Sequence, residues 1–269
     1  VRNFLGSRTS SANISAVVAT HSPALMDYTP DEAGLSLVHM LETGTVVADI
    51  TDDLLEWVKE QAPELGVESL GHMFLYRGFL LVEGPQDAQV LKKFYGQRLD
   101  SERIGMIPLW GISGKLNLTE SRYFRATRIP IGILLDNVFS SLSAIGNDSY
   151  EERQLEAFQK EFDREGIPFQ GAGHHRTDII PALPEPAVQR FLAEKGIEGM
   201  FADGWDPIEQ AVRDMNLNSS DKKKELARQL GLGSQRRFKH GLSGPNFIDP
   251  VLELCEESDR PHHSLENAM

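Results

Sequence analysis

The hydrophobic pattern from residue 79 onward alternates between short apolar runs and amphipathic stretches. An amphipathic helix is predicted after the first run, because Val90, Leu91 and Phe94 share one face, and a second helix is predicted near 117–127. Strands and helices that alternate at this spacing form right-handed crossovers, and therefore a parallel sheet with helices on both faces. The predicted fold class is α/β. Its strands are the apolar runs at 79–82, 104–110 and 131–135.

The sequence before residue 79 has a different pattern. Residues 14–20, ISAVVAT, form a β-branched run that predicts a buried strand. The segments LSLVHML (35–41) and TVVADI (45–50) are predicted to pair as a hairpin. From Thr51, a Thr/Asp cap and apolar residues at helical spacing predict a short connecting helix that ends at Pro63.

The sequence after residue 149 is mainly helical. A long polar helix is predicted over 150–165, followed by a late strand at IPFQ (167–170). Three further segments each combine a helix cap with an apolar stripe. These segments are EPAVQRFLAEKG, DPIEQAVRDMN and SDKKKELARQLG. The tail, 257–269, is predicted to be disordered.

Composition restricts the class of protein. With 269 residues and 40% hydrophobic content, the chain can form one large or two modest domains. No apolar run approaches the ~18 residues that span a bilayer, and the N-terminus lacks a signal-peptide block, so a cytoplasmic protein is expected. One cysteine, Cys255, excludes internal disulfides and cysteine-based zinc clusters. The formal charge of −13 excludes coating of nucleic acid by bulk electrostatics, so any such contact is local.

Three carboxylates are predicted to meet at one edge of the sheet. Glu83 and Asp136 each directly follow a predicted strand, and Asp87 opens the helix after the first one. Ligands bind at the carboxyl ends of parallel strands. Converging carboxylates repel one another unless a cation such as Mg²⁺ or Mn²⁺ neutralises them, so a metal site is the economical interpretation. Taken singly, Asp87 is more simply a helix-start carboxylate and Asp136 a turn residue.

Several motifs resemble one known family. LLVEGPQDAQVL resembles the first signature of the Toprim domain, GILLDN the second, and GISGK the glycine element between them. Upstream, AVVATHSPALMD resembles the last strand of an ABC-type ATPase head, in which the histidine after the strand senses the γ-phosphate of the nucleotide. The order of these motifs is similar to that in the OLD (overcoming lysogenization defect) family of ATPase–nucleases, over residues 14–180.

The resemblance implies a division of the chain into five parts, in which a Toprim-like domain lies between an ATPase-like end and a helical region. The parts are 1–50, the end of an ABC-type ATPase-like head; 51–75, a linker helix; 76–182, the Toprim-like domain; 183–256, a helical C-terminal region; and 257–269, the disordered tail.

The resemblance also implies an activity, that of a metal-dependent DNA endonuclease in nucleic-acid defence or repair. Glu83 would act as general base or metal ligand, Asp87 and Asp136 would hold Mg²⁺ or Mn²⁺, and Lys115 would steady the scissile phosphate. His21 would contact a nucleotide. The implied partners are DNA, an ATPase partner or a missing N-terminal half, and further copies of the chain in a homo-oligomer, with no membrane.

Two departures from the family pattern leave alternatives open. Val138 stands where the second Asp of Asp-x-Asp is expected, and either Asp148 or Asp178 could replace it. The chain has no Gly-x-x-x-x-Gly-Lys-Ser/Thr loop, so ATP is expected only if an ATPase segment elsewhere completes the site. The main alternative is a catalytically degenerate Toprim that acts as an interaction or regulatory module in a larger ATPase complex. A nucleotidyl- or phosphoryl-transfer enzyme is a weaker alternative, because the elements it needs are not visible.

The sequence predicts different environments for two pairs of adjacent histidines. His174 and His175 could contact a phosphate or a metal, but adjacent side chains on an extended segment point apart, which argues against one shared ion. His262 and His263, in the tail, are expected to be solvated. The basic residues expected to orient DNA, besides Lys115, are Arg122 and Arg176.

Overall fold

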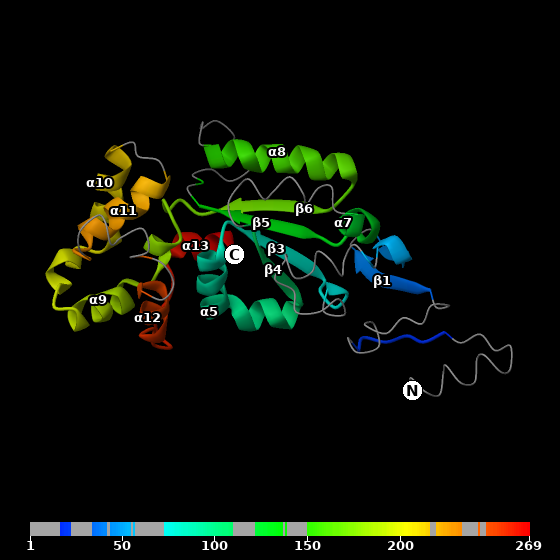
Figure 1. Ribbon diagram of the computed structural model, residues 1–269, viewed down its shortest axis with the longest axis horizontal. Helices are drawn as coiled ribbons and strands as arrows, with labels where there is room; N and C mark the ends of the chain where they lie inside the picture. The colour runs from blue at the N-terminus through cyan, green and yellow to red at the C-terminus, as the bar shows by residue number, and fades with distance from the viewer. Residues whose placement is uncertain are drawn as a thin grey trace.

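The computed structural model describes residues 17–22, 34–41, 44–54, 56, 73–109, 122–136, 138, 150–215, 219–232, 242 and 246–269. Its centre is a four-stranded parallel sheet with the strand order β4-β3-β5-β6 (Figure 1). The α/β fold and the three predicted strands are confirmed, and the late strand begins two residues after its predicted start. The strands are β3 (Gly78–Val82), β4 (Ile104–Pro108), β5 (Ile131–Leu135) and β6 (Phe169–Gly173).

The helices between the strands cover both faces of the sheet. Side chains of α5 (Pro85–Glu102) join one hydrophobic cluster, and side chains of α7 (Arg122–Thr127) and α8 (Tyr150–Glu165) join the other. The connection after β3 leads to β4 on one side, whereas the connection after β5 leads to β6 on the other. The chain therefore reverses its direction of travel between β3 and β5, which makes the carboxyl ends of these strands a topological switch point.

Alternation along the strands supplies both clusters. In β3, Phe79 and Leu81 face the cluster under α7 and α8, whereas Leu80 and Val82 face the cluster that α5 shares with the C-terminal helices. Successive side chains of a strand point to opposite faces of a sheet. A central strand with apolar residues on both faces is therefore covered on both, as the uninterrupted run FLLV predicts.

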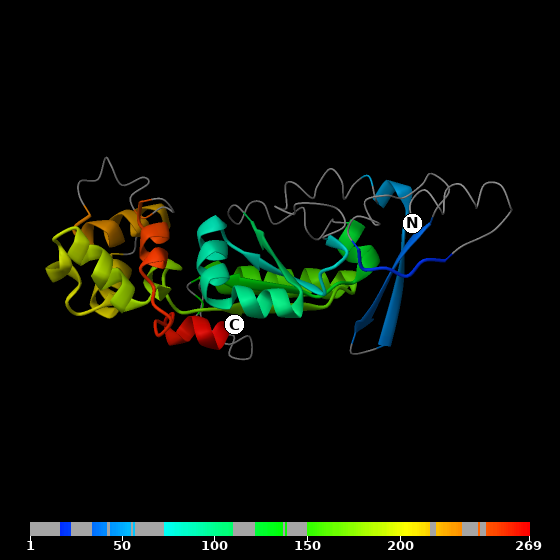
Figure 2. The same cartoon turned by 90° about the horizontal axis from the view of Figure 1, so that it is seen from below.

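An antiparallel hairpin precedes the sheet, as predicted. Strand β1 (Leu35–Leu41) pairs with β2 (Gly44–Ile50) along its length. Residues 52–54 and 56 are helical, and the rest of the predicted connecting helix lies outside the described residues. Viewed from below, the hairpin lies at one end of an elongated molecule and the C-terminal helices lie at the other (Figure 2).

The prediction of a buried strand at 14–20 is wrong for the part that the structure describes. Residues 17–20 form no strand, and the side chain of Val17 is 100% exposed. Residues 14–16 lie outside the described part. A β-branched run forms a buried strand only where a neighbouring strand accepts its hydrogen bonds and an apolar surface covers it, and no described residue pairs with 17–20.

The C-terminal region is helical, and its last part corrects another prediction. The tail 257–269 is not disordered throughout: it contains a short helix, α13 (His263–Ala268), in which Leu265 is fully buried in the cluster shared with α5. A single buried leucine in a polar segment leaves no stripe in the sequence by which to predict this helix. The helices are α9 (Glu185–Glu194), α10 (Trp205–Asp214), α11 (Ser219–Gln229), α12 (Ile248–Glu253) and α13 (His263–Ala268), with short 3₁₀ turns at Ile180–Ala182 and Glu198–Phe201.

The described helices include none that is both long enough and apolar enough to cross a membrane.

Candidate metal site at the carboxyl edge of the sheet

Two of the predicted carboxylates flank the topological switch point. Strands β3 and β5 are neighbours, and Val82 pairs with Leu134 at their carboxyl ends. Glu83 is the first residue after β3, and Asp136 is the first residue after β5. Both residues therefore leave the sheet at the same edge and beside the same crevice, where open α/β sheets bind their ligands.

Asp87 lies in the first turn of the helix that follows β3. Its side chain is only 9% exposed. A Cβ added at Gly84 would lie 3.4 Å from Asp87 Oδ2, so the carboxylate lies close over the Gly84 backbone. Helix α5 begins with Pro85, which is favoured at a first helical position because an N–H group there has no acceptor within the helix. The sequence EGPQD thus holds Asp87 close to the end of β3.

The imidazole of His174 lies beside one of the three carboxylates and is influenced by the other two. Nε2 of His174 lies 2.8 Å from Asp136 Oδ1, and the residue is 1% exposed. Burial lowers the pKa of His174, and the negative charges of four nearby carboxylates oppose this effect. The four are Asp87, Asp178, Glu209 and Glu83. One side chain is therefore in contact with Asp136 and within electrostatic reach of both Glu83 and Asp87.

Backbone hydrogen bonds hold His174 at this place. The N–H of His174 donates to the carbonyl of Leu135 at 3.1 Å, and the carbonyl of His174 accepts from the N–H of Val138 at 3.0 Å. These bonds continue the pairing of β5 and β6 past the ends of both strands. The role of His174 beside Asp136 was not predicted. The signal in the sequence was its position directly after β6, at the same edge as the carboxylates.

Val138, which stands where the second Asp of the motif is expected, belongs to the hydrophobic core. Its side chain is 5% exposed and packs with the residues under α7 and α8. A Cβ added at Gly173 would collide with the Val138 side chain, so the two positions are in close contact. The chain at 138 therefore supplies apolar packing in place of a ligand.

Asp178 is one of the two residues considered as a replacement for that missing carboxylate. It is buried, its Oδ1 accepts from the N–H of Ile180 at 3.1 Å, and its charge acts on His174. Asp178 is therefore in the neighbourhood of the candidate site. The other candidate, Asp148, lies outside the described residues.

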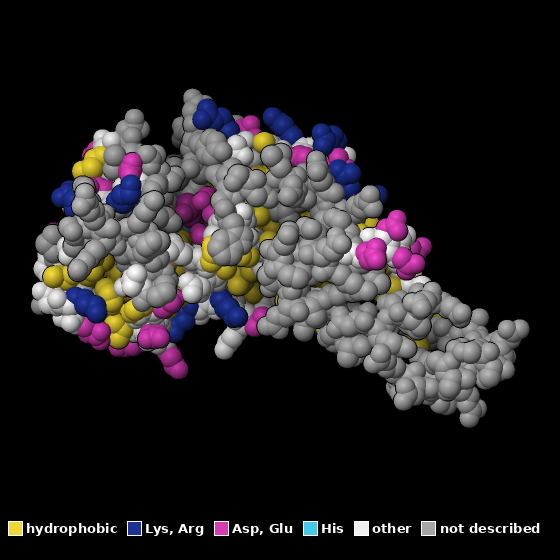
Figure 3. All heavy atoms as spheres, viewed as in Figure 1, with side chains coloured by type: hydrophobic (Ala, Val, Ile, Leu, Met, Phe, Trp, Pro, Cys, Tyr) yellow, Lys and Arg dark blue, Asp and Glu magenta, His cyan; other side chains and the backbone are white. Residues whose placement is uncertain are grey.

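The types of residue present suit a hard divalent cation. Carboxylate oxygens are the ligands that Mg²⁺ and Mn²⁺ prefer. Both ring nitrogens of His174 are buried and neither has a hydrogen-bond partner among the described residues, although Nε2 lies 2.8 Å from Asp136 Oδ1 in an ion-pair contact. A cation with its bound water would satisfy such a nitrogen and offset the charge of the carboxylates around it. Figure 3 shows acidic side chains in a recess between the C-terminal helices and the sheet.

The structure does not place the other predicted site residues beside the carboxylates. Lys115 lies outside the described residues. His21 is exposed in the segment 17–22, which both ribbon views place on the hairpin side of the sheet, away from α13 (Figures 1 and 2). Arg122 begins α7, which leads into the start of β5 and so lies toward the opposite edge of the sheet from Asp136.

Arg176 is not available to orient DNA. Its side chain is 3% exposed, and its guanidinium forms ion pairs with Glu209 and Asp206 of α10. Glu209 also accepts from the N–H and the hydroxyl of Thr177, each at 2.8 Å. These bonds anchor the segment after β6 to the helical region. A basic residue beside a histidine pair is therefore a structural residue here, with acidic partners, one of them buried, that the sequence did not reveal.

The two adjacent histidines do point to different sides, as predicted. His174 contacts Asp136, whereas the ring of His175 lies near the rings of His262 and His263, with centroids 5.4 and 5.9 Å away. The expectation that the tail pair is solvated holds for the exposed His263 but is wrong for His262, which is partly buried. Ordering of the tail as α13 brings these rings to the sheet edge.

Comparison with known proteins yields a structural similarity and no sequence match. No family model matches the chain, and no curated protein matches it. Among solved structures, it is similar to the C-terminal region of the Burkholderia pseudomallei OLD protein, with 16% sequence identity and a TM-score of 0.35. The similarity covers 66% of this chain and 96% of that chain. These comparisons assign no family to the chain.

Proposed function

We propose that this chain is a metal-dependent DNA endonuclease of the Toprim type. The observation that carries the proposal is the position of Glu83, Asp87 and Asp136 at the switch point of a parallel sheet, where a buried histidine is in contact with Asp136 and within electrostatic reach of the other two. The resemblance of LLVEGPQD and GILLDN to the two Toprim signatures supports it. DNA is the proposed substrate, and the proposed assembly is a homo-oligomer with an ATPase segment supplied by the same or another chain, which would be required for any use of ATP.

Glu83, Asp87 and Asp136 would hold Mg²⁺ or Mn²⁺. When bound, such a cation supplies an activated water and stabilises the negative charge that develops on the phosphate. Without a cation, the like charges of these carboxylates would repel one another.

The chain's own residues have separate tasks in this proposal. Glu83 would accept the proton of the attacking water as general base. His174 is a positioning residue, because its Nε2 lies 2.8 Å from Asp136 Oδ1 and restricts where that carboxylate points. Asp178 would add a carboxylate in place of the one that Val138 lacks. Lys115 would contact the scissile phosphate.

The test is nicking of supercoiled plasmid in Mn²⁺ by the intact protein and by Glu83→Ala. We expect the substitution to slow nicking on the order of 10²- to 10⁴-fold, the usual contribution of a general base. Glu102→Ala is the matched control, because Glu102 is an exposed glutamate at the other end of α5. Equal rates of nicking by the intact protein and by Glu83→Ala would contradict the proposed nuclease function.

One observation favours a second candidate function, a catalytically degenerate Toprim that acts as an interaction or regulatory module. Val138 is part of the core, so the position of the second Asp contributes no ligand. The formal charge of −13 also disfavours DNA binding. Calorimetric titration separates the candidates: absence of Mg²⁺ and Mn²⁺ binding at millimolar concentration leaves the module as the function.

A further inference from the structure

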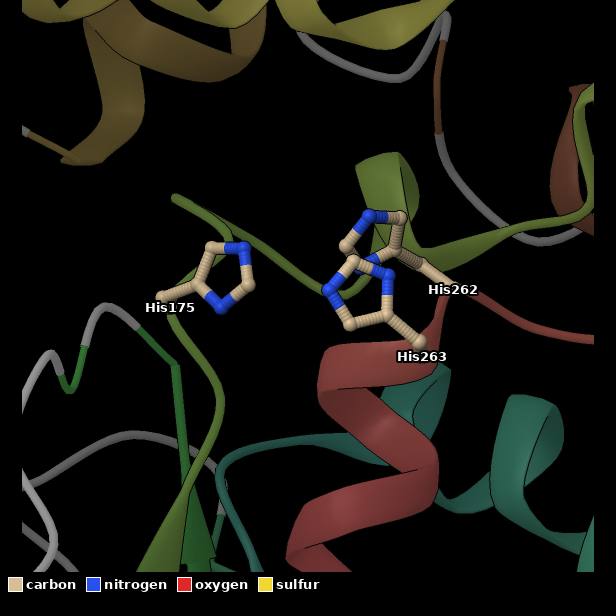
Figure 4. A group of neighbouring side chains, drawn as sticks. All are labelled: His175, His262 and His263. Carbon is tan, nitrogen blue, oxygen red and sulfur yellow. The ribbon is translucent and has the colours of Figure 1, made fainter.

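Three histidines outside the carboxylate site bring their ring nitrogens together. Ligand atoms of His175, His262 and His263 all lie within 4.8 Å of one another (Figure 4). We propose that these histidines bind Zn²⁺ at a site separate from the carboxylates. The proposal does not depend on nuclease activity, because it rests on different side chains and a different ligand chemistry.

The ligands come from two segments that are far apart in the sequence. His175 follows β6 by two residues, His262 caps α13, and His263 is the first residue of that helix. The N–H of His262 donates to the carbonyl of Ala182 at 2.9 Å, which fixes the start of α13. Leu265 is fully buried one turn later. The backbone of the site is therefore held in place without a metal.

The separation of the rings suits a tetrahedral ion. Zn–N bonds of about 2.0–2.1 Å in a tetrahedral site place the ligand nitrogens about 3.3 Å apart. The rings of His262 and His263 have centroids 4.0 Å apart, and the ring of His175 faces both (Figure 4). The exposed His263 is free to rotate about its side-chain bonds. Small rotations would bring the three nitrogens onto one ion and leave the fourth position to water.

The protonation state of the rings favours metal binding, because zinc binds neutral imidazole. Burial and the nearby Arg176 lower the pKa of His262 to about 4, and the same two causes lower the pKa of His175. Nδ1 of His262 accepts from the Ser264 N–H at 3.2 Å and lies 2.8 Å from the Ser264 hydroxyl, which can either donate or accept. With Nε2 on the metal, Nδ1 would carry the hydrogen and donate to that hydroxyl, as is typical of zinc-binding histidines, and the bond from the Ser264 N–H would be given up.

The surrounding charges permit a dication. Arg176 acts on His175 and His262, and Arg213 acts on His175, while the negative charges of Glu209 and Asp206 oppose these two arginines. Imidazole nitrogens suit zinc, whereas Mg²⁺ and Mn²⁺ prefer oxygen ligands. The two sites would therefore select different metals in the same solution. Bound zinc would join α13 to the segment after β6 and stabilise the folded chain by mass action.

Calorimetry and cobalt absorption test the proposal on the full chain. We expect each chain to bind one Zn²⁺ that excess Mg²⁺ does not displace. Co²⁺ bound in place of Zn²⁺ should show the strong visible absorption of a tetrahedral site. His263→Ala is the main variant, because its ring is exposed and its loss should not impair folding. We expect it to weaken Zn²⁺ binding by about 100-fold and to remove the tetrahedral cobalt spectrum.

Two controls make the result specific. Asn267→Ala changes an exposed residue of the same helix, and His39→Gln removes a histidine of β1 while its amide can still reach the Thr127 carbonyl that His39 contacts. Both should bind Zn²⁺ as the intact protein does. Absence of Zn²⁺ binding by the intact chain, or unchanged binding by His263→Ala, would overturn the proposal.

A carboxylate variant separates this proposal from the nuclease. Glu83→Gln/Asp87→Asn should lose Mn²⁺-dependent nicking and keep Zn²⁺ binding with the cobalt spectrum unchanged. Loss of Zn²⁺ binding in this variant would mean that the ion binds at the carboxylates, and would overturn the histidine site. Failure of nicking in the intact protein, with Zn²⁺ binding intact, would count against the nuclease alone.

Discussion

His174 and His175 are consecutive residues whose side chains enter two different chemical environments. His174 is buried beside carboxylates, with Asp136 in contact and Glu83 within electrostatic reach. His175 is partly buried beside the imidazoles of α13 and its cap. Because side chains alternate along an extended backbone, one short segment contributes to an oxygen-rich site and to a nitrogen-rich site. The difference teaches that consecutive residues can contribute to two candidate ligand sets, one of oxygens that suits Mg²⁺ or Mn²⁺ and one of nitrogens that suits Zn²⁺.

The two environments share one anchor. Glu209 of α10 accepts two hydrogen bonds from Thr177 and pairs with Arg176, and its side chain is itself 2% exposed. Its charge also acts on His174. The segment after β6 is thus fixed to the helical region at the residues that directly follow the histidine pair.

The largest expected effect is the loss of that anchor. Glu209→Ala removes the buried acidic partner of Arg176 and leaves only the exposed Asp206, and removal of one member of a buried ion pair costs about 3–5 kcal/mol. We expect the free energy of unfolding, measured in urea, to fall by that amount and both metals to bind more weakly. Gln210→Ala, an exposed neighbour on the same helix, is the control. An unchanged unfolding midpoint would show that the two environments do not depend on Glu209.

A smaller effect is expected when the missing carboxylate is supplied. Val138→Asp would place a carboxyl group in the core against Gly173, at a cost of about 2–3 kcal/mol even as a neutral buried polar group without a partner. We expect lower stability and no gain in Mn²⁺ affinity. Val138→Ala, which removes volume and adds no charge, separates packing from burial of the carboxylate. Tighter Mn²⁺ binding by Val138→Asp would mean that position 138 can turn toward the metal.

The smallest expected effect separates the two histidines themselves. His174→Asn keeps a polar side chain beside Asp136 but changes its reach, and loss of a residue that orients a metal ligand costs about tenfold in affinity. We expect Mn²⁺ binding to weaken by that factor in calorimetric titration, with Zn²⁺ binding unchanged. If Zn²⁺ binding weakens equally, the two environments are coupled, and the comparison between them does not hold.

The sheet and the carboxylates could be predicted from the sequence because their signals are local. Runs such as FLLV and IGILL are apolar on both faces, which a covered parallel strand requires, and Glu83 and Asp136 directly follow their strands. Knowledge of strand ends alone was enough to place both residues at one edge. Asp87 follows from the helix start after EGP.

The histidine cluster could not be predicted, because it depends on where a short terminal helix docks. The segment HHSLENAM contains one leucine that becomes fully buried, which gives no periodicity to detect. The buried partner of Arg176, Glu209, is likewise supplied by α10, far along the chain. The β-branched run before His21 led to the prediction of a strand that the described residues do not form. Local propensity for a strand cannot show whether a neighbouring strand is present to pair with it.

Gly173 and Val138 lie so close that each limits what the other can be. A side chain at 173 would occupy the space that Val138 fills. In related sequences we therefore expect these two positions to change together, with a larger residue at 173 tolerated only where 138 is small. The paired sizes of the residues at 138 and 173 would therefore help to align distant relatives, even where the carboxylates themselves have been lost.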